Sequence, residues 1–177
     1  KNTAPAVTLA ALKFSNSKED PILLVLSTDH LIQNNSAFHR AIEIGKTLAE
    51  QEKLVTFGIM PTTPETGYGY IEIKKSKSKK YHNIKSFIEK PSLDNAKSYI
   101  HSSNYYWNSG IFMFKASVYL KELDKFEPEI LKACNKSFNN SYEDLDFLRL
   151  NKEEFNKCPE KSIDYAVMEN TSNGAVV

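Results

Sequence analysis

The sequence predicts an α/β fold in which a mixed, mainly parallel, Rossmann-like sheet carries helices on both faces. Continuous apolar runs at 21–26 and 54–59 are typical of strands that are buried on both faces of a parallel sheet. Between them, residues 36–51 place apolar side chains at helical spacing, with Asn35 or Ser36 as the expected cap. The three segments therefore predict a strand–helix–strand unit with a right-handed crossover.

The other expected elements follow in order along the chain. Pro5 precedes an apolar helical run that ends near Leu12. Residues 69–73 and 84–88 have the pattern of a strand hairpin, and we interpret its lysine-rich tip at 74–80 as a solvated turn. Further along we expect a helix at 92–101 capped by Ser92, a strand at 111–115, mainly helical structure to about 168, and the start of a strand at 174–177.

Composition places the chain among ordinary soluble globular proteins. Its 177 residues are enough for one domain with a sizeable core, and the net charge of +1 gives no reason to expect nucleic acid or a membrane as a partner. No apolar run approaches the roughly 20 residues of a membrane span. The two cysteines, Cys134 and Cys158, lack zinc or redox spacing, argue against a disulfide scaffold and predict a reducing, cytoplasmic location.

Charged residues follow two of the expected strands. Asp29 comes just past the carboxyl end of the first strand, where open α/β sheets bind ligands, and its carboxylate could hold Mg²⁺ or cap the next segment. Adjacent strand residues such as Glu89 and Lys90 point to opposite faces, but Pro91 favours a strand end here. Glu89 could then accept from sugar hydroxyls while Lys90 binds a phosphate. A surface ion pair is the alternative.

Two glycine-containing segments accompany these charges. Gly69, in the segment 66–70, would let the backbone approach a ligand closely, although a simple hairpin entry explains the same residues. Asn108 has the donors and acceptor needed to read a hydroxyl, or else it begins a turn that continues to Gly110. The aromatic neighbours are expected either to pack in the core or to stack on a sugar: Tyr105, Tyr106 and Trp107.

The order of these segments and their amino-acid sequences closely resemble those of one family, the bacterial mannose-1-phosphate guanylyltransferases. These enzymes make GDP-mannose, often as the first half of a bifunctional enzyme with mannose-6-phosphate isomerase. The resemblance covers essentially the whole chain and implies a Rossmann-like nucleotidyltransferase fold of the GT-A-like type. The most specific stretches are 2–6, 54–59, 64–71, 87–91, 105–112 and 162–169.

The resemblance also implies roles for individual residues. Asp29 matches the family's first magnesium-binding aspartate, so Mg²⁺ is the implied cofactor, and Lys90 matches the lysine that meets the sugar phosphate. Asp164 lies in a family-like stretch without a clear chemical role, and a structural cap explains it equally well. The family's sugar contacts match Gly69, Glu89 and Asn108. The segment that lines the guanine pocket includes Asn2 and Thr3.

The chain departs from the family pattern at both ends. It contains neither the family's glycine-rich phosphate loop nor its second metal-binding aspartate. We therefore expect residues 1–177 to be a partial nucleotidyltransferase domain, truncated at both ends and inactive or nearly so by itself. Ser27 and Thr28 replace the usual proline and alanine before Asp29, a change that we expect to be tolerated.

The reaction implied for the full-length protein is transfer of a guanylyl group from GTP to mannose 1-phosphate, with release of pyrophosphate. Two alternatives stay open: a nucleotidyltransferase for another sugar 1-phosphate, and a non-catalytic regulatory homologue that binds a sugar nucleotide. The sequence also leaves open whether the protein forms a homo-oligomer. Each interpretation requires the polar segments, which are distant along the chain, to converge at one rim of the fold.

Overall fold

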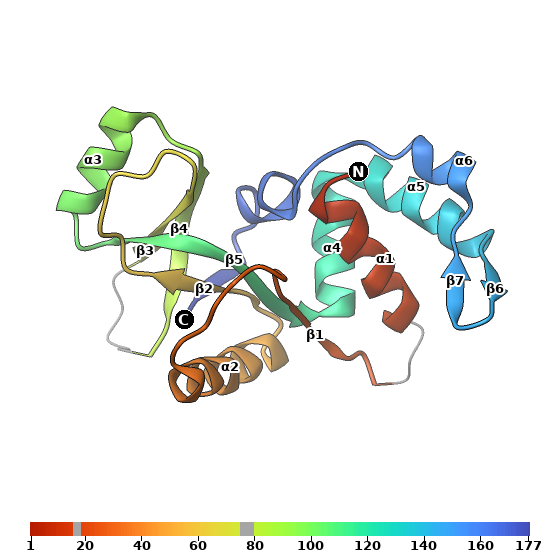
Figure 1. Ribbon diagram of the computed structural model, residues 1–177, viewed down its shortest axis with the longest axis horizontal. Coiled ribbons are helices and arrows are strands. Elements are labelled where there is room, and N and C mark those ends of the chain that lie inside the picture. Colours follow the sequence, from red (N-terminus) through yellow and green to blue (C-terminus); the bar gives the residue numbers. More distant parts are fainter. Residues whose placement is uncertain (16–18, 75–79) are drawn as a thin grey trace. The chain divides into compact units, whose positions relative to one another are not determined.

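The computed structural model describes residues 1–15, 19–74 and 80–177, which form two compact units (Figure 1). Unit 1 consists of Lys1–Pro21 and Ala116–Asn170, and unit 2 consists of Ile22–Lys115 and Thr171–Val177. Unit 1 is mainly helical, whereas unit 2 contains the large sheet.

Unit 2 is built on a six-stranded sheet with the order β1-β5-β2-β8-β4-β3 and an additional pairing of β5 with β3. Following the pairings from β5 to β2, β8, β4 and β3 leads back to β5, so these five strands form a closed ring of pairings. The strands are β1 (Ile22–Val25), β2 (Leu54–Ile59), β3 (Gly69–Lys74), β4 (His82–Glu89), β5 (Tyr105–Lys115) and β8 (Gly174–Val176).

The sheet is mixed, as the sequence predicts, but the prediction that it is mainly parallel is wrong. Strands β2 and β8 pair in parallel, and the other five pairings between the described strands of this sheet are antiparallel. Strands β1 and β2 do run in the same direction, but β5 lies between them and runs the opposite way. An apolar run indicates that a strand is buried, but it does not indicate whether the neighbouring strands run parallel or antiparallel to it.

Helix α2 (Asn35–Glu50) covers one face of this sheet, which we call the outer face. Its Gly45 lies so close to β2 that an added Cβ would be 3.0 Å from the ring of Phe57. Leu48 and Ala49 join Phe57 and Met113 in one apolar cluster. The absence of a side chain at Gly45 thus lets the helix pack directly on β2 and β5, where burial of apolar surface holds it.

Helix α3 (Leu93–His101) also contacts the outer face. Trp107 of β5 pairs with Ile59 of β2 and with Tyr70 of β3, and paired side chains share a face. The ring of Tyr99 in α3 lies 5.3 Å from that of Tyr70. The described helices of unit 2 therefore share one face, and the predicted arrangement with helices on both faces is not met within this unit.

Helix caps and strand starts test the local predictions. Ser92 caps α3 as predicted, because its hydroxyl accepts from the N–H of Asn95. The cap of α2 is Asn34, whose side chain accepts from the N–H of Ala37 at 2.9 Å, so the two predicted caps, Asn35 and Ser36, are both wrong. Strand β5 begins at Tyr105 rather than at 111, because pairing with β3 extends it through polar residues.

Unit 1 packs its helices around buried side chains, among them Ala11, Tyr119 and Leu123. The hydroxyl of Tyr119 lies 3.2 Å from Thr8 Oγ1 and from the carbonyl oxygen of Ala4, which ties α4 to α1. The elements are α1 (Thr3–Ser15), α4 (Ala116–Phe126), α5 (Pro128–Asn139), β6 (Tyr142–Asp144), β7 (Phe147–Arg149), α6 (Lys152–Asn156) and the π-helix η1 (Asp164–Met168).

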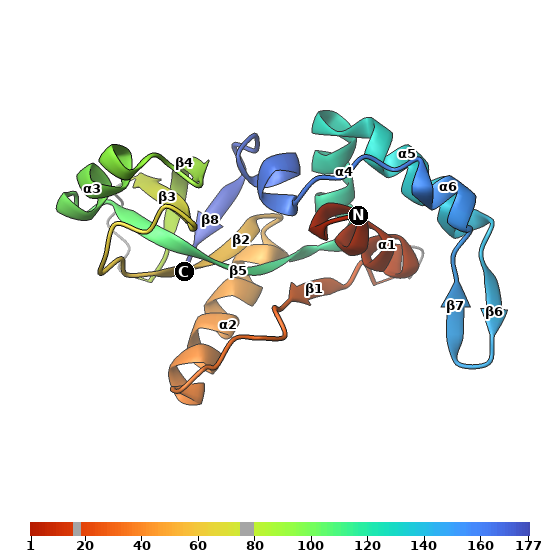
Figure 2. The same ribbon diagram turned by 45° about the horizontal axis from the view of Figure 1, so that its top comes forward.

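A short hairpin interrupts the helical part of unit 1. Strands β6 and β7 pair antiparallel between α5 and α6, as Figure 2 shows. We predicted mainly helical structure here, and that prediction is wrong for this segment. Arg149 both bonds Asp144 at 2.8 Å and lies over the ring of Phe147, contacts that join the two strands without a helical pattern.

The two cysteines meet in unit 1 although they are distant along the chain. Cys134 and Cys158 are buried, and their Sγ atoms lie 3.9 Å apart as free thiols. Neither forms a disulfide, as the sequence predicts. Burial raises the pKa of both thiols, which disfavours the reactive thiolate.

The remaining predictions concern the lysine-rich segment and membrane spans. The hairpin is confirmed, because β3 ends at Lys74 and β4 begins at His82, whereas residues 75–79 lie outside the described part of the chain. Among the helices that the structure describes, none is both long and apolar enough to cross a membrane.

Candidate functional site

Three predicted sugar-contacting residues meet on the face of the sheet opposite α2, which we call the inner face. Gly69 of β3 pairs with Glu89 of β4. A Cβ added to Gly69 would lie only 2.5 Å from Glu89 Oε2 and 3.3 Å from Asn108 Cβ. Glycine therefore lets the Glu89 carboxylate approach β3 closely, and any side chain at position 69 would displace that carboxylate. We call these three residues the inner-face cluster.

Lys90 lies beside this cluster. Strand β4 ends at Glu89, and Lys90 turns away with a positive φ of 49°, so the predicted strand end is confirmed. Its N–H donates to the carbonyl oxygen of Tyr68, and its Nζ lies 4.0 Å from Glu89 Oε1. The Lys90 side chain is 59% exposed and that of Glu89 only 12%. An accessible cation thus lies next to a mostly buried carboxylate.

The Asn108 side chain is anchored by two donors. Its Oδ1 accepts from the N–H of Gly110 at 3.2 Å and from Thr56 Oγ1 at 2.9 Å. The second contact joins β5 to β2 in the interior of the sheet. Sequence reasoning missed Thr56, although a lone hydroxyl within the apolar run 54–59 was a usable signal, because a buried polar group needs a partner.

The aromatic residues before Asn108 pack among other aromatic rings. Tyr105 stacks on Tyr99 with ring centroids 4.2 Å apart, and Trp107 meets the edge of Tyr68 at 5.2 Å. Trp107 is on the outer face, the opposite one from Asn108, because neighbouring strand residues alternate. These contacts support the core-packing interpretation over sugar stacking at the inner-face cluster.

Asp29 lies in the exposed loop that follows β1. Val25 and Thr56 both pair with Phe112 of β5, so β1 and β2 flank β5 and run in the same direction, and the loop leaves the sheet at the end of β1. Ser27 Oγ donates to Asp29 Oδ1 and lowers the pKa of this carboxyl. Asn34, not Asp29, caps the following helix, which removes the capping alternative for α2.

The metal-binding prediction depends on how many ligands the protein supplies. In residues 1–15, 19–74 and 80–177, no group of three or more His, Cys, Asp or Glu side chains could hold a metal ion. An ionised, accessible Asp29 nevertheless fits Mg²⁺, which commonly binds one or two carboxylates and completes its shell with phosphate oxygens and water.

The other predicted residues gather in unit 1. Asn2 has a φ of 70°, and its Oδ1 accepts from the N–H of Thr3 at 2.8 Å. Thr3 Oγ1 in turn accepts from the N–H of Ile163 at 2.9 Å, next to Asp164 at the start of η1. These contacts bind the backbone and join the start of α1 to η1. The guanine-pocket role of Asn2 and Thr3 stays a prediction.

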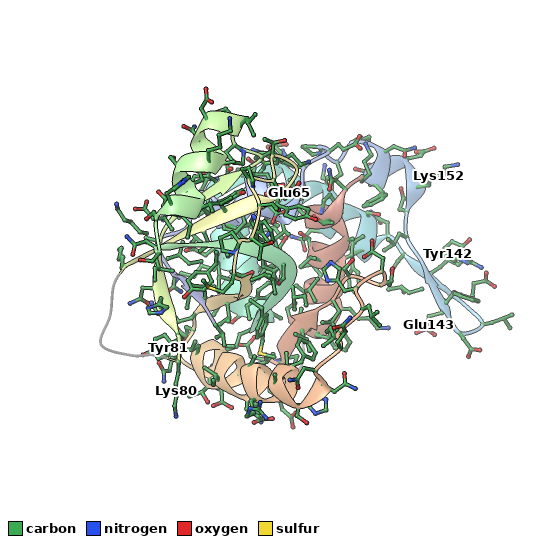
Figure 3. The ribbon with its side chains drawn as sticks, turned by 60° about the vertical axis from the view of Figure 1, so that its left-hand side comes forward. Glu65, Lys80, Tyr81, Tyr142, Glu143 and Lys152 are labelled. Carbon is green, nitrogen blue, oxygen red and sulfur yellow. The ribbon has the colours of Figure 1, made fainter. Side chains whose placement is uncertain are left out.

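A small cavity of about 90 Å³ also lies in unit 2, and its lining residue Gly58 pairs with Asn108. Its lining includes Gly58, His82 and Tyr106, together with Lys80 and Tyr81, which Figure 3 labels at the start of β4. His82 and Tyr106 stack with ring centroids 6.4 Å apart. A space of this size is too small for a nucleotide, since ligand pockets usually measure about 300–1,000 Å³.

Sequence comparisons place these residues in a wider context. A protein-family model described as "Nucleotidyl transferase" matches residues 1–153. The xanthan biosynthesis protein XanB of Xanthomonas campestris pv. campestris is 50% identical over 177 residues, and a mannose-1-phosphate guanylyltransferase of Escherichia coli K12 is 48% identical over 183 residues. All of this chain is covered in both matches, and it spans 38% of the length of each relative.

Two solved structures share the fold. A mannose-6-phosphate isomerase from Helicobacter pylori is 38% identical with a TM-score of 0.89, and the match covers all of this chain and 68% of that one. A mannose-1-phosphate geranyltransferase from Thermus thermophilus is 31% identical with a TM-score of 0.82, over 99% of this chain and 49% of that one. The α/β arrangement with a mixed sheet is therefore shared with these proteins.

Proposed function

Because this chain belongs to the nucleotidyl transferase family, we propose that the full-length protein is a mannose-1-phosphate guanylyltransferase. It transfers a guanylyl group from GTP to mannose 1-phosphate and releases pyrophosphate. The observation that carries the proposal is the inner-face cluster, in which Gly69, Glu89 and Asn108 meet from three different strands. The chain spans 38% of its relatives' length, so the activity is assigned to the full-length protein.

Sugar recognition falls to the inner-face cluster. The Glu89 carboxylate accepts hydrogen bonds only, and the Asn108 amide offers donors and an acceptor, so together they complement sugar hydroxyls. The side chain of Glu89 is mostly shielded from water, which strengthens its bonds to a bound hydroxyl. Gly69 allows the ring of a sugar to approach because no Cβ fills the space between the two side chains.

Lys90 serves the phosphate of mannose 1-phosphate. Its accessible ammonium lies 4.0 Å from Glu89, so one ligand can offer hydroxyls to Glu89 and a phosphate to Lys90. A phosphate oxygen attacks the α-phosphorus of GTP in line and displaces pyrophosphate. The attacking oxygen is already anionic, so alignment and charge neutralisation, rather than a strong general base, are the tasks of the protein.

Asp29 is the proposed magnesium ligand. The hydrogen bond from Ser27 lowers the pKa of this exposed carboxyl further below its ordinary range and favours the ionised form that a metal needs. Bound Mg²⁺ would neutralise charge on the phosphates. The guanine-pocket role of Asn2 and Thr3 is proposed from the family resemblance, beside the backbone hydrogen bonds that both side chains accept. The buried free thiols Cys134 and Cys158 suit the reducing cytoplasm that we propose as the location.

The test uses the full-length protein with GTP, Mg²⁺ and a panel of sugar 1-phosphates. We expect pyrophosphate release with mannose 1-phosphate at a kcat/KM at least about tenfold above that with glucose 1-phosphate, a ratio that one well-placed hydrogen bond can supply. If the protein prefers another sugar 1-phosphate, that compound becomes the assigned substrate in place of mannose 1-phosphate. Binding of GDP-mannose without any turnover would instead support a regulatory homologue and overturn the proposed function.

A further inference from the structure

We propose that Thr56 is a positioning residue for the sugar site, and that its buried hydroxyl, together with the Gly110 N–H, holds the oxygen end of the Asn108 amide in place. This inference rests on the proposed function, because it concerns how the same site reads a sugar. Thr56 is fully buried in β2, next to β5 in the sheet, and it belongs to an otherwise apolar strand.

The first step is the orientation of the amide. The two ends of an asparagine side chain differ chemically, since the oxygen only accepts and the nitrogen only donates. The backbone N–H of Gly110 can only donate, and it lies 3.2 Å from the Asn108 atom assigned as Oδ1. That contact therefore requires the oxygen at this position and supports the assignment.

The second step is the contribution of Thr56. Its Oγ1 lies 2.9 Å from Asn108 Oδ1, so the hydroxyl donates its hydrogen to the same oxygen. The carbonyl oxygen of Ile111 lies 3.0 Å away on the same strand as Asn108 and is a second acceptor for this hydrogen. A flipped amide would place N–H groups against the Gly110 N–H and lose that bond, so the Gly110 donor sets the orientation and the Thr56 hydroxyl holds the oxygen in place.

The third step is what this orientation means for the ligand. With Oδ1 held by Thr56 and Gly110, the amide nitrogen is the donor end of Asn108, and Glu89 in the same cluster is an acceptor. A sugar hydroxyl both donates and accepts, so it matches a donor beside an acceptor. If the amide flipped, oxygen atoms of both residues would face the ligand, and neither could donate to a hydroxyl.

The experiment compares Thr56→Val with Thr56→Ser in the full-length protein. Valine keeps the shape and removes the hydroxyl, whereas serine keeps the hydroxyl. We expect Thr56→Val to raise the KM for mannose 1-phosphate about tenfold, the usual effect of one lost hydrogen bond, with the KM for GTP within about twofold of wild type. Thr56→Ser should restore the KM for mannose 1-phosphate to within about twofold.

A double-mutant cycle with Asn108→Ala tests whether Thr56 acts through Asn108. Adding Thr56→Val to Asn108→Ala should change the KM by less than about twofold, because the amide is already gone. The inference would be overturned if the effects of the two substitutions on the KM for mannose 1-phosphate multiply in the double mutant. It would also be overturned if Thr56→Val changes the KM of both substrates equally, or if Thr56→Ser behaves like Thr56→Val.

Folding and activity controls separate this inference from the proposed function. Wild-type protein without transferase activity contradicts the proposed function, whereas an active wild type with an unaffected Thr56→Val variant contradicts only the role of Thr56. Thermal unfolding of each variant checks the fold. If Thr56→Val does not fold, Thr56→Ala replaces it, and failure of both to fold would assign Thr56 to core stability and reject the positioning role.

Discussion

The inner-face cluster of unit 2 projects from paired strands, whereas the candidate residues Asn2 and Thr3 of unit 1 bind the backbone near the start of a helix. In the inner-face cluster, Glu89 Oε2 and Asn108 Cβ both lie next to the position that a Cβ of Gly69 would occupy. In unit 1, Asn2 and Thr3 both accept hydrogen bonds from backbone N–H groups. Polar side chains named from the sequence as ligand contacts can therefore stand at a sheet surface or bind the backbone, and the difference is testable.

The largest expected effect is that of Glu89→Gln. The variant loses a charge-assisted acceptor in a mostly shielded place, so kcat/KM for mannose 1-phosphate should fall about 100-fold, with unfolding little changed. Steady-state kinetics of the full-length enzyme measure this. The matched control is Glu72→Gln, a carboxylate on the outer face of β3 that bonds Lys85, for which kcat/KM should stay within about twofold.

Gly69→Ala tests the close approach in the same cluster. The added Cβ would meet Glu89 Oε2 at 2.5 Å, and the end of this flexible side chain must move. We expect about a tenfold loss in kcat/KM for mannose 1-phosphate, with a thermal midpoint close to wild type. Gly67→Ala is the control, because nothing lies within 4 Å of its added Cβ, and an equal loss there would contradict the explanation.

Thr3→Val tests the structural role in unit 1. The substitution leaves the N–H of Ile163 without its side-chain acceptor, so the free energy of unfolding should fall by about 1 kcal/mol. Urea unfolding measures the change, and Thr3→Ser should recover most of it. A raised KM for GTP at unchanged stability would instead favour the guanine-pocket assignment of this residue.

The smallest expected effect concerns the pH dependence of the Glu72–Lys85 pair on the outer face. The hydrogen bond from Lys85 lowers the pKa of Glu72 in the folded protein. The pair therefore contributes its full stabilisation at pH values above the pKa of an unfolded glutamate, about 4.3. The contribution is lost as the pH falls through the lowered folded pKa.

The Glu72→Gln variant measures this contribution. At pH 7 it should be destabilised by roughly 0.5 kcal/mol, since Lys85 is largely exposed. The difference from wild type should shrink toward zero as the pH falls below the folded pKa. A difference that grows on acidification would have the wrong sign for a carboxyl with a lowered pKa.

Short-range features were predictable because neighbouring residues decide them. The apolar run 54–59 coincides with β2, Ser92 caps its helix, and the strand before Pro91 ends at Glu89. Each depends on side-chain type over a few positions. The same reasoning missed the hairpin of β6 and β7, where polar residues and a cation–π contact replace any strong strand pattern.

The candidate site was predictable as a set of residue types but not as a geometry. The sequence singled out Gly69, Glu89 and Asn108, yet nothing in their spacing revealed that Thr56 bonds Asn108 across 52 positions. That contact depends on β2 and β5 pairing, and on a register shift between Thr56 and Gly58 that brings Asn108 alongside.

By itself the sequence determined the type and approximate place of most strands and helices, the cap of α3 and the end of β4, since these follow from local spacing and side-chain chemistry. The tertiary structure alone decided that the sheet is mostly antiparallel, which residues share its inner face and which thiols meet. Those outcomes depend on pairing between segments far apart in the chain, and a strand's own composition does not record which neighbour it will have.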